Sequence, residues 1–173
     1  MPCSRPISSS KLSGFRGDVT GGSVLDVGCY DGALLGALGP EVRKYGVEAS
    51  ASAAGVARTR GVEIVAAKIS ELGSVRRTFD DVCAVDVIEH LLDPGAFVEA
   101  LIGLLAPGGL LVVSTGSLDM PAWRLTGGRY WYCGFPERIS FISPAWGREL
   151  ATRLNLEPCE VQRFAYAEQR AQT

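Results

Sequence analysis

The sequence predicts an α/β protein built on a doubly wound, mostly parallel sheet with helices on both faces. Short apolar segments alternate with amphipathic segments along most of the chain, as strands and helices do in such folds. The apolar segments lack a regular alternation with polar residues, which indicates strands that are buried on both faces. We expect six strands, with a seventh as the alternative, and a ligand beyond the carboxyl ends of the strands.

Composition favours a soluble globular protein. Of the 173 residues, 47% are hydrophobic and the formal net charge is −2, so the chain can bury a core and lacks the basic balance of proteins that bind nucleic acid. No apolar run approaches the about 20 residues needed to span a membrane. The five scattered cysteines form no C-x-x-C pair, as is typical of reduced thiols in the cytoplasm. We expect a flexible arm at 1–22, one domain at 23–166 and a polar tail at 167–173.

Six segments are predicted as strands because each is a short run rich in Val, Ile, Leu and aromatic residues, bounded by glycine or polar residues. They are 23–28, 44–50, 62–67, 79–88, 110–115 and 156–166.

Helices are predicted between these strands, from capping residues and apolar spacing. They are 31–39, 50–61, a short weak helix at 70–77, 93–109 and 143–155. Ser50 is the expected N-cap of the second helix and Asp93 that of the fourth, where Pro94 occupies the first turn. Pro107-Gly108-Gly109 is expected to end that fourth helix.

The sequence "VLDVGCYDG" places a glycine turn after the first strand. A dinucleotide fingerprint would be G-x-G-x-x-G, whereas Gly28 and Gly32 here form G-x-x-x-G. Tyr30 stands where a backbone would have to approach a pyrophosphate closely, and Asp31 adds a negative charge. These features disfavour NAD and suit a zwitterionic ligand without phosphate.

The chain at this point resembles the class I S-adenosylmethionine-dependent methyltransferases, which have a Rossmann-like fold. The blocks that carry the resemblance are "VLDVGCYDG", "YGVEAS", "FDDVCAVDVIEHLLDP" and "LAPGGLLVVST", in this order, and it extends over roughly 23–165. The branch most similar to it includes quinone-biosynthesis and sugar O-methyltransferases. The resemblance implies S-adenosylmethionine as the cofactor and an enzyme that methylates a small molecule.

Cofactor-binding positions are implied residue by residue. They are Asp26, Gly28, Cys29, Tyr30, Gly32, Glu48, Ala49, Ser50, Lys68, Ile69, Asp86 and Val87. Glu48 follows the second strand, where a carboxylate can accept both ribose hydroxyls; the alternative is a surface glutamate. Asp26 is expected to hold the ligand's ammonium or, alternatively, to cap the turn. Lys68 departs from the family's usual acidic residue near the adenine.

His90, the only histidine, follows the fourth strand and is the expected catalytic base, because histidine exchanges protons near neutral pH. The alternative is that Glu89 and His90 fix the loop or contact the cofactor. We expect no metal site, since related enzymes that bind a metal through a Glu-His motif use further histidines.

The segment 116–142 is long for a loop and is rich in aromatic and arginine side chains. We expect a lid that binds the acceptor through Trp123, Tyr130, Trp131 and Arg138, since aromatic faces bind rings and attract cations. A lid that packs its aromatic side chains on the core is the alternative.

The main functional hypothesis is methyl transfer to a small-molecule acceptor, through a hydroxyl oxygen. The alternative is a catalytically silent, methyltransferase-like cofactor-binding or partner subunit. A nucleotide-dependent reductase and a nucleic-acid methyltransferase are both disfavoured, the latter by charge and by the absence of an Asn/Asp-Pro-Pro-aromatic motif. The short tail after the sixth strand predicts an uncovered sheet edge near 157–166, closed by a homodimer or another cover.

Overall fold

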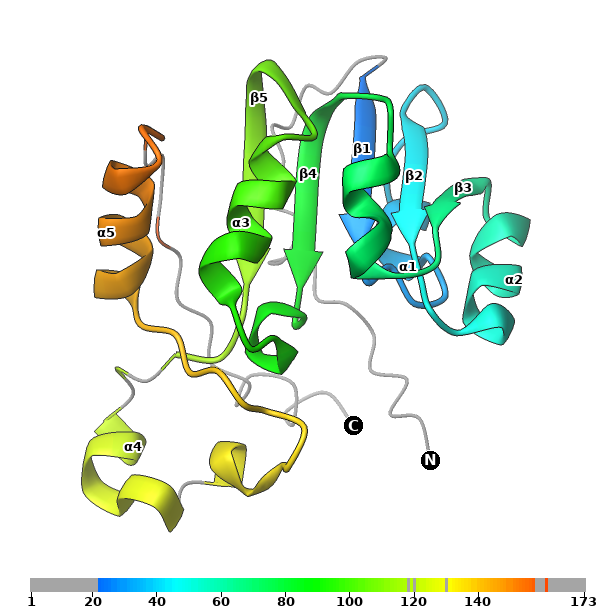
Figure 1. The fold of residues 1–173 in the computed structure, drawn as a ribbon. Coiled ribbons are helices and arrows are strands. Elements are labelled where there is room, and N and C mark those ends of the chain that lie inside the picture. The colour runs from blue at the N-terminus through cyan, green and yellow to red at the C-terminus, as the bar shows by residue number, and fades with distance from the viewer. Residues whose placement is uncertain (1–21, 118, 120, 130, 158–160, 162–173) are drawn as a thin grey trace.

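A five-stranded parallel sheet forms the centre of the molecule (Figure 1). The computed structural model describes residues 22–117, 119, 121–129, 131–157 and 161. Its strands are β1 (Ser23–Val27), β2 (Arg43–Val47), β3 (Val62–Ala66), β4 (Phe79–Val85) and β5 (Leu105–Ser114). They lie in the order β3-β2-β1-β4-β5 with all pairings parallel, which confirms the predicted doubly wound arrangement.

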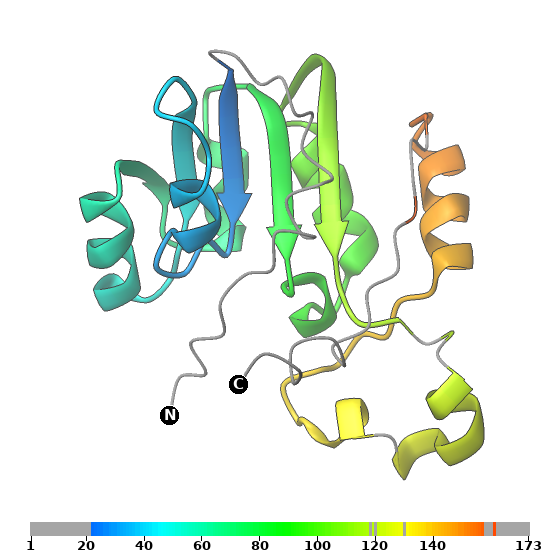
Figure 2. The same ribbon diagram turned by 180° about the vertical axis from the view of Figure 1, so that it is seen from behind.

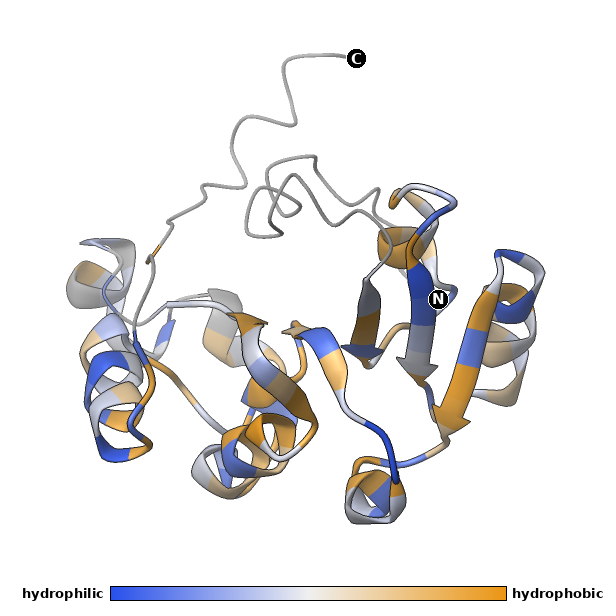
Figure 3. Ribbon diagram, turned by 90° about the horizontal axis from the view of Figure 1, so that it is seen from above, coloured by the Kyte–Doolittle hydropathy of each residue, from blue (hydrophilic) through white to orange (hydrophobic). Residues whose placement is uncertain are grey.

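Helices cover both faces of this sheet. The α-helices are α1 (Ala33–Gly36), α2 (Ala51–Thr59), α3 (Pro94–Ile102), α4 (Pro121–Thr126) and α5 (Pro144–Arg153). The 3-10 helices are η2 (Ile69–Ser74), η3 (Ile88–His90), η4 (Gly127–Arg129) and η5 (Trp131–Gly134). Helix α3 lies on one face of the sheet (Figure 1) and α1 on the opposite face (Figure 2), so that the strands form a middle layer when seen from above (Figure 3).

Two apolar clusters fill the space on the two faces. Successive side chains of a strand point to opposite faces. Accordingly Leu25 and Val27 of β1 join the cluster that contains α3, whereas Val24 joins the cluster under α1 and α2. All three are completely buried. This explains why the strand segments are apolar throughout, as expected for a parallel sheet covered on both sides.

Three predicted helix starts are confirmed by their capping bonds. Ser50, Asp93 and Ser143 each accept, through a side-chain oxygen, the backbone N–H three residues further on, at 3.3, 2.9 and 3.2 Å. Such caps satisfy amides that the first helical turn leaves without a partner.

The boundary between α3 and β5 was predicted wrongly. The helix ends at Ile102 and β5 begins at Leu105, whereas we expected a helix to Gly109 and a strand from Leu110. Leu105 already pairs with Phe79 of β4, and the register then shifts before Asp81 pairs with Leu110. Pro107-Gly108-Gly109 therefore forms an irregularity within the strand, because pairing with β4 outweighs the local helix-stop signal.

Other elements are shorter than predicted. The strand predicted at 79–88 ends at Val85, because Asp86 adopts a left-handed conformation with φ 54°. The strand predicted at 44–50 ends at Val47, and the helix predicted at 31–39 is the single turn α1. Residues 69–74 form a 3-10 helix in place of the weak α-helix expected at 70–77.

The predicted sixth strand, 156–166, falls mostly outside the described residues. Its described residues, Leu156, Glu157 and Val161, belong to no strand, so the sheet has five strands in the described part of the chain where we expected six. Residues 1–21 of the arm predicted at 1–22, and the tail at 167–173, also lie outside the described residues. In the part that is described, none of the helices has the length and apolar character needed to cross a bilayer.

A carboxylate of β1 is buried within the sheet. Asp26 of β1 is 3% exposed, and its Oδ1 accepts a hydrogen bond from the Cys83 thiol of the adjacent strand β4, at 3.3 Å. Burial raises the pKa of Asp26 to about 7; the Cys83 bond lowers it and the charge of Glu48 raises it further. Burial also raises the pKa of the Cys83 thiol, which therefore remains a donor.

We predict that Gly46→Ala destabilises the fold. A Cβ at position 46 of β2 would lie 2.4 Å from the Cys29 sulfur and 3.1 Å from a Val62 methyl group, so the free energy of unfolding should fall by about 1–3 kcal/mol. Gly55→Ala in α2 is the matched control, because nothing lies within 4 Å of its added Cβ; it should stabilise by about 0.5–1 kcal/mol. Urea unfolding measures both, and equal effects of the two substitutions would contradict this packing.

We predict that Asp26→Asn changes stability in a pH-dependent way. The pKa of Asp26 in the folded protein, about 7, lies above its ordinary value of 3.8, so ionisation opposes folding. The wild type should lose stability relative to the variant as pH rises from about 4 to 7, by at most about 1.4 kcal/mol per pH unit, and the difference should be constant above that window.

Urea unfolding at pH 5, 6, 7 and 8 measures this difference. Glu63→Gln is the control, because the Glu63 side chain is 65% exposed and its replacement should change stability little at any of these pH values. A difference between Asp26→Asn and wild type that is the same at pH 5 and pH 8 would show that the carboxylate is not buried as described.

Candidate active site

The turn between β1 and α1 is attached to the end of β2. The Val47 carbonyl accepts both the Gly28 amide, at 2.8 Å, and the Cys29 amide, at 3.1 Å. Gly28 has φ 84° and Gly32 has φ 73°, conformations that glycine adopts without strain. A Cβ at Gly28 would lie 2.6 Å from a Val87 methyl group, so this turn also packs closely against the residue two positions after β4.

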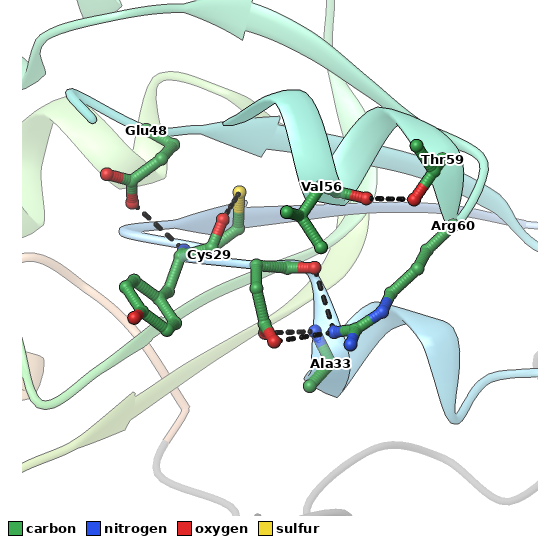
Figure 4. Close-up of polar contacts among 8 residues, drawn as sticks. Cys29, Ala33, Glu48, Val56, Thr59 and Arg60 are labelled. Carbon is green, nitrogen blue, oxygen red and sulfur yellow. Dashed lines mark hydrogen bonds and ion pairs between the residues drawn. The ribbon is translucent and has the colours of Figure 1, made fainter. Parts of the chain in front are cut away.

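Tyr30 is the unusual residue of the turn. It has φ 48°, which is uncommon for an aromatic residue, and it is 46% exposed. Its backbone amide donates to Glu48 Oε2 at 2.9 Å (Figure 4). The left-handed conformation at this position is therefore held by a bond from outside the turn.

Glu48 is fixed by backbone amides at the end of β2. Besides the bond from Tyr30, its Oε1 accepts the amide of Ser50 at 2.7 Å. Each carboxylate oxygen has a second lone pair, so this pre-oriented group can still accept bonds from a ligand's hydroxyls. Ala49 and Ser50 are exposed beside it, and the Ser50 hydroxyl caps α2.

Asp31 faces the helices. Its Oδ1 accepts the Ala33 amide at 3.0 Å, and its Oδ2 lies 2.8 Å from an Arg60 nitrogen, which also donates to the Asp31 carbonyl at 2.9 Å (Figure 4). Arg60, at the end of α2, thus neutralises the negative charge of Asp31, which was one of the features that disfavoured a phosphate ligand. The glycine spacing and the position of Tyr30 still disfavour NAD. Sequence reasoning missed Arg60, and no local signal marks it.

The two groups beneath the turn are buried. Cys29 is 4% exposed, and burial, with the charges of Asp26 and Glu48, raises the pKa of its thiol to about 12. Cys29 can therefore offer a ligand its backbone but no thiolate. The contact predicted between the buried Asp26 carboxylate and a ligand's ammonium stays a prediction.

The end of β3 carries an acidic group that we did not predict. The Glu71 carboxylate accepts the backbone amides of Ala67, at 2.9 Å, and Lys68, at 3.2 Å. Lys68 itself is exposed and Ile69 is half-buried. Although Lys68 departs from the family pattern, a carboxylate is present nearby. Glu71 is the third residue of η2, and because the N-cap is a lysine the sequence carries only the glutamate half of a capping box.

The residues after β4 form a compact loop. The Asp86 amide donates to the Ser114 carbonyl at 2.8 Å, which joins the ends of β4 and β5. Glu89 is 1% exposed and accepts the Thr115 hydroxyl at 2.8 Å. Glu89 thus fixes this loop, which is one of the two alternatives considered for it.

His90, next to Glu89, is exposed. Its Nδ1 lies 2.7 Å from the carbonyl oxygen of Glu137, in the segment that was predicted to be a lid. That segment lies beyond the carboxyl ends of β4 and β5, on the same edge of the sheet as the glycine turn (Figure 1). The structure thus places the predicted base beside the predicted lid.

Of the four residues expected to bind the acceptor, the structure describes the side chains of Trp123 and Arg138. Trp123 is half-buried with its ring centroid 5.7 Å from that of Phe141, so it packs within the lid segment. The Arg138 guanidinium lies 4.5 Å from the centre of the Phe135 ring, next in sequence to the carbonyl that contacts His90. Tyr130 and the side chain of Trp131 lie outside the described part.

No three His, Cys, Asp or Glu side chains gather as metal ligands would within the described ranges. The titratable groups at this edge include Glu48 after β2, Glu71 after β3, and Asp86 and His90 after β4.

Comparison with known proteins places the chain in a family. Residues 9–161 match the methyltransferase-domain family. A ubiquinone biosynthesis O-methyltransferase from Paraburkholderia xenovorans is 29% identical over 164 residues, which are 86% of this chain and 70% of that protein. One from Xanthomonas oryzae is 39% identical over 126 residues, 64% of this chain and 49% of that protein. The chain spans about half the length of several such relatives, for example 45% and 49%.

Solved structures show the same fold. A SAM-dependent methyltransferase from Thermotoga maritima has a TM-score of 0.67 at 22% identity, covering 87% of this chain and 70% of that one. An N-methyltransferase from Bradyrhizobium japonicum in complex with S-adenosyl-L-homocysteine has a TM-score of 0.53 at 23% identity, covering 61% and 58%. With a family match over most of its length, the chain belongs to the methyltransferase-domain family and is a class I S-adenosylmethionine-dependent methyltransferase.

Proposed function

We propose that the protein methylates a hydroxyl oxygen of a small-molecule acceptor, with Glu48 as the ribose ligand and His90 as the general base. The observation that carries the proposal is the contact between Gly28 and Val87. Because Val87 precedes η3 directly, this contact brings the loop that bears His90 against the glycine turn. Support for oxygen as the nucleophile comes from relatives that are named O-methyltransferases.

The chemistry needs little beyond positioning and a base. When bound, S-adenosylmethionine supplies a methyl group that its sulfonium already activates. An acceptor oxygen would take that methyl group as the carbon–sulfur bond breaks and S-adenosylhomocysteine leaves as a neutral thioether. The part left to this chain is to hold the two partners at the correct distance, which supplies much of the acceleration. His90 takes the hydroxyl proton as the oxygen attacks, and it then returns this proton to solvent.

The acceptor is proposed to bind under the 116–142 segment, with Arg138 at the side of His90. A homodimer or another cover at the sheet edge near 157–166 stays a proposal from the sequence, since most of that segment lies outside the described residues. A cytoplasmic location and the absence of a nucleic-acid partner remain expectations from composition. The catalytically silent alternative has no support among the relatives, which are named as enzymes.

We predict that Glu48→Ala weakens the binding of S-adenosylmethionine and S-adenosylhomocysteine. The substitution removes charge-assisted bonds worth about 1.5–3 kcal/mol, which corresponds to a dissociation constant raised about tenfold to a hundredfold. Isothermal titration calorimetry measures the change. Glu63→Ala is the control, since the Glu63 side chain on β3 is 65% exposed and its ion-pair partner is Arg77. Unchanged affinity in Glu48→Ala would remove Glu48 from the site.

We predict that His90→Ala lowers kcat roughly a hundredfold or more and changes cofactor affinity little. His90→Gln is the sharper variant, because its amide N–H can still donate to the Glu137 carbonyl but cannot take a proton. Both are assayed across pH on phenols, sugars and quinols that the wild type methylates, with amines as a test of nitrogen acceptors. A normal rate at every pH would return His90 to a structural role.

A further inference from the structure

The bond between His90 and the lid segment fixes the hydrogen positions of the imidazole. A backbone carbonyl can only accept, so the 2.7 Å contact between His90 Nδ1 and the Glu137 oxygen requires a hydrogen on Nδ1. In the neutral ring, Nε2 is then the atom with the free lone pair. We infer that residues 137–140, here called the 137–140 strap, are the positioning element of His90: they hold the imidazole in its Nδ1–H tautomer and so reserve Nε2 for the proton of the acceptor.

The strap is attached on both sides of His90. The Glu89 carbonyl accepts the amides of Ile139, at 2.9 Å, and Ser140, at 3.0 Å. The Ser140 hydroxyl donates to the Leu91 carbonyl at 2.5 Å. Residues 89 and 91 are therefore both bound by the strap, and the ring contact of residue 90 lies between these attachments. The carbonyl at 137 is thus held close to Nδ1 by bonds that do not involve the ring.

The residue under these bonds is anchored in the core. Glu89 is almost completely buried, and its side chain is held by Thr115 at the end of β5. The strap consequently links the imidazole to the sheet through backbone groups. The group that contacts His90 is the backbone carbonyl of Glu137, which does not change its protonation state with pH. A carboxylate in the same position would add charge; a carbonyl orients the ring without doing so.

This arrangement has a consequence for catalysis that rests on the proposed function. A neutral imidazole without this bond exchanges between two tautomers, and only the one with a bare Nε2 can accept a proton there. The strap is part of the segment 116–142, so the placement of that segment and the competence of the base are physically connected. Ser140 and Ile139 are therefore positioning residues, which act on the reaction through His90.

The test uses the fact that His90 is the only histidine of the chain. In full-length protein labelled with ¹⁵N-histidine, two-bond ¹H–¹⁵N correlation spectra at pH 8.5 give a single imidazole pattern, which distinguishes a protonated Nδ1 from a protonated Nε2. The wild type is expected to show the Nδ1–H tautomer. A protonated Nε2, or a rapidly averaged mixture of the two tautomers, would overturn the inference.

Two substitutions test whether the strap is the cause. Ile139→Pro removes one of the amides that bind the Glu89 carbonyl, and Ile139→Ala is its control because it keeps that amide. Ser140→Ala removes the hydroxyl bond to Leu91, whereas Ser140→Thr retains a hydroxyl. Ile139→Pro and Ser140→Ala should shift the pattern towards the averaged mixture, and the two conservative variants should not. Well-dispersed amide spectra establish that each variant is folded. If Ile139→Pro and Ser140→Ala both keep the wild-type tautomer, the strap does not set it and the inference is overturned.

Kinetics separates this inference from the proposed function. Ser140→Ala should lower kcat about twofold to tenfold without changing cofactor affinity, and Ser140→Thr should recover the rate. Thr152→Ala, which removes a hydroxyl bond to the Arg148 carbonyl in α5, is the matched control and should retain the wild-type rate. If His90→Ala proves fully active, the proposed base is refuted, while the spectra still decide independently whether the strap sets the tautomer.

Discussion

The ligand-binding edge depends on two backbone hydrogen bonds, from Gly28 and Cys29 to the carbonyl of Val47. They join the turn after β1 to Val47, the last residue of β2, and Glu48 follows directly after that strand. Because β1 and β2 pair in parallel, their carboxyl ends coincide and the turn cannot move without disturbing the sheet. The carboxylate of Glu48 then accepts the Tyr30 amide, so the group proposed to bind ribose also stabilises the glycine turn.

Two buried carboxylates lie beneath this edge, and they differ in what they do. Asp26 has a weak thiol donor as its partner and a raised pKa, which makes its ionised form costly to the fold. Glu89 accepts the Thr115 hydroxyl and fixes the loop that carries His90. Buried carboxylates of this kind lower the stability of the fold, and they lie where the site is built. Such a trade between stability and activity is common in enzymes.

The two halves of the site are built by different means. The cofactor half is made from strand ends and from a turn whose conformation is set by glycine, so its geometry follows from the sheet. The proposed acceptor half is the segment 116–142, which is attached to the loop after β4 by backbone bonds around His90. Acceptor choice can therefore change through this segment while cofactor binding is preserved, as is common for functions carried on loops of a shared fold.

The sequence by itself determined the features that depend on neighbours within one turn or one strand. These include the order of strands and helices, the caps at Ser50 and Asp93, and the glycine turn after β1, because capping and burial patterns act over three or four residues. Only the tertiary structure decided that Arg60 pairs with Asp31 across 29 residues and that the Glu137 carbonyl binds His90 across 47. It also decided that Pro107-Gly108-Gly109 lies within β5. Each of these outcomes depends on which distant segments the sheet brings together, and pairing between strands there outweighs the local preference of the chain.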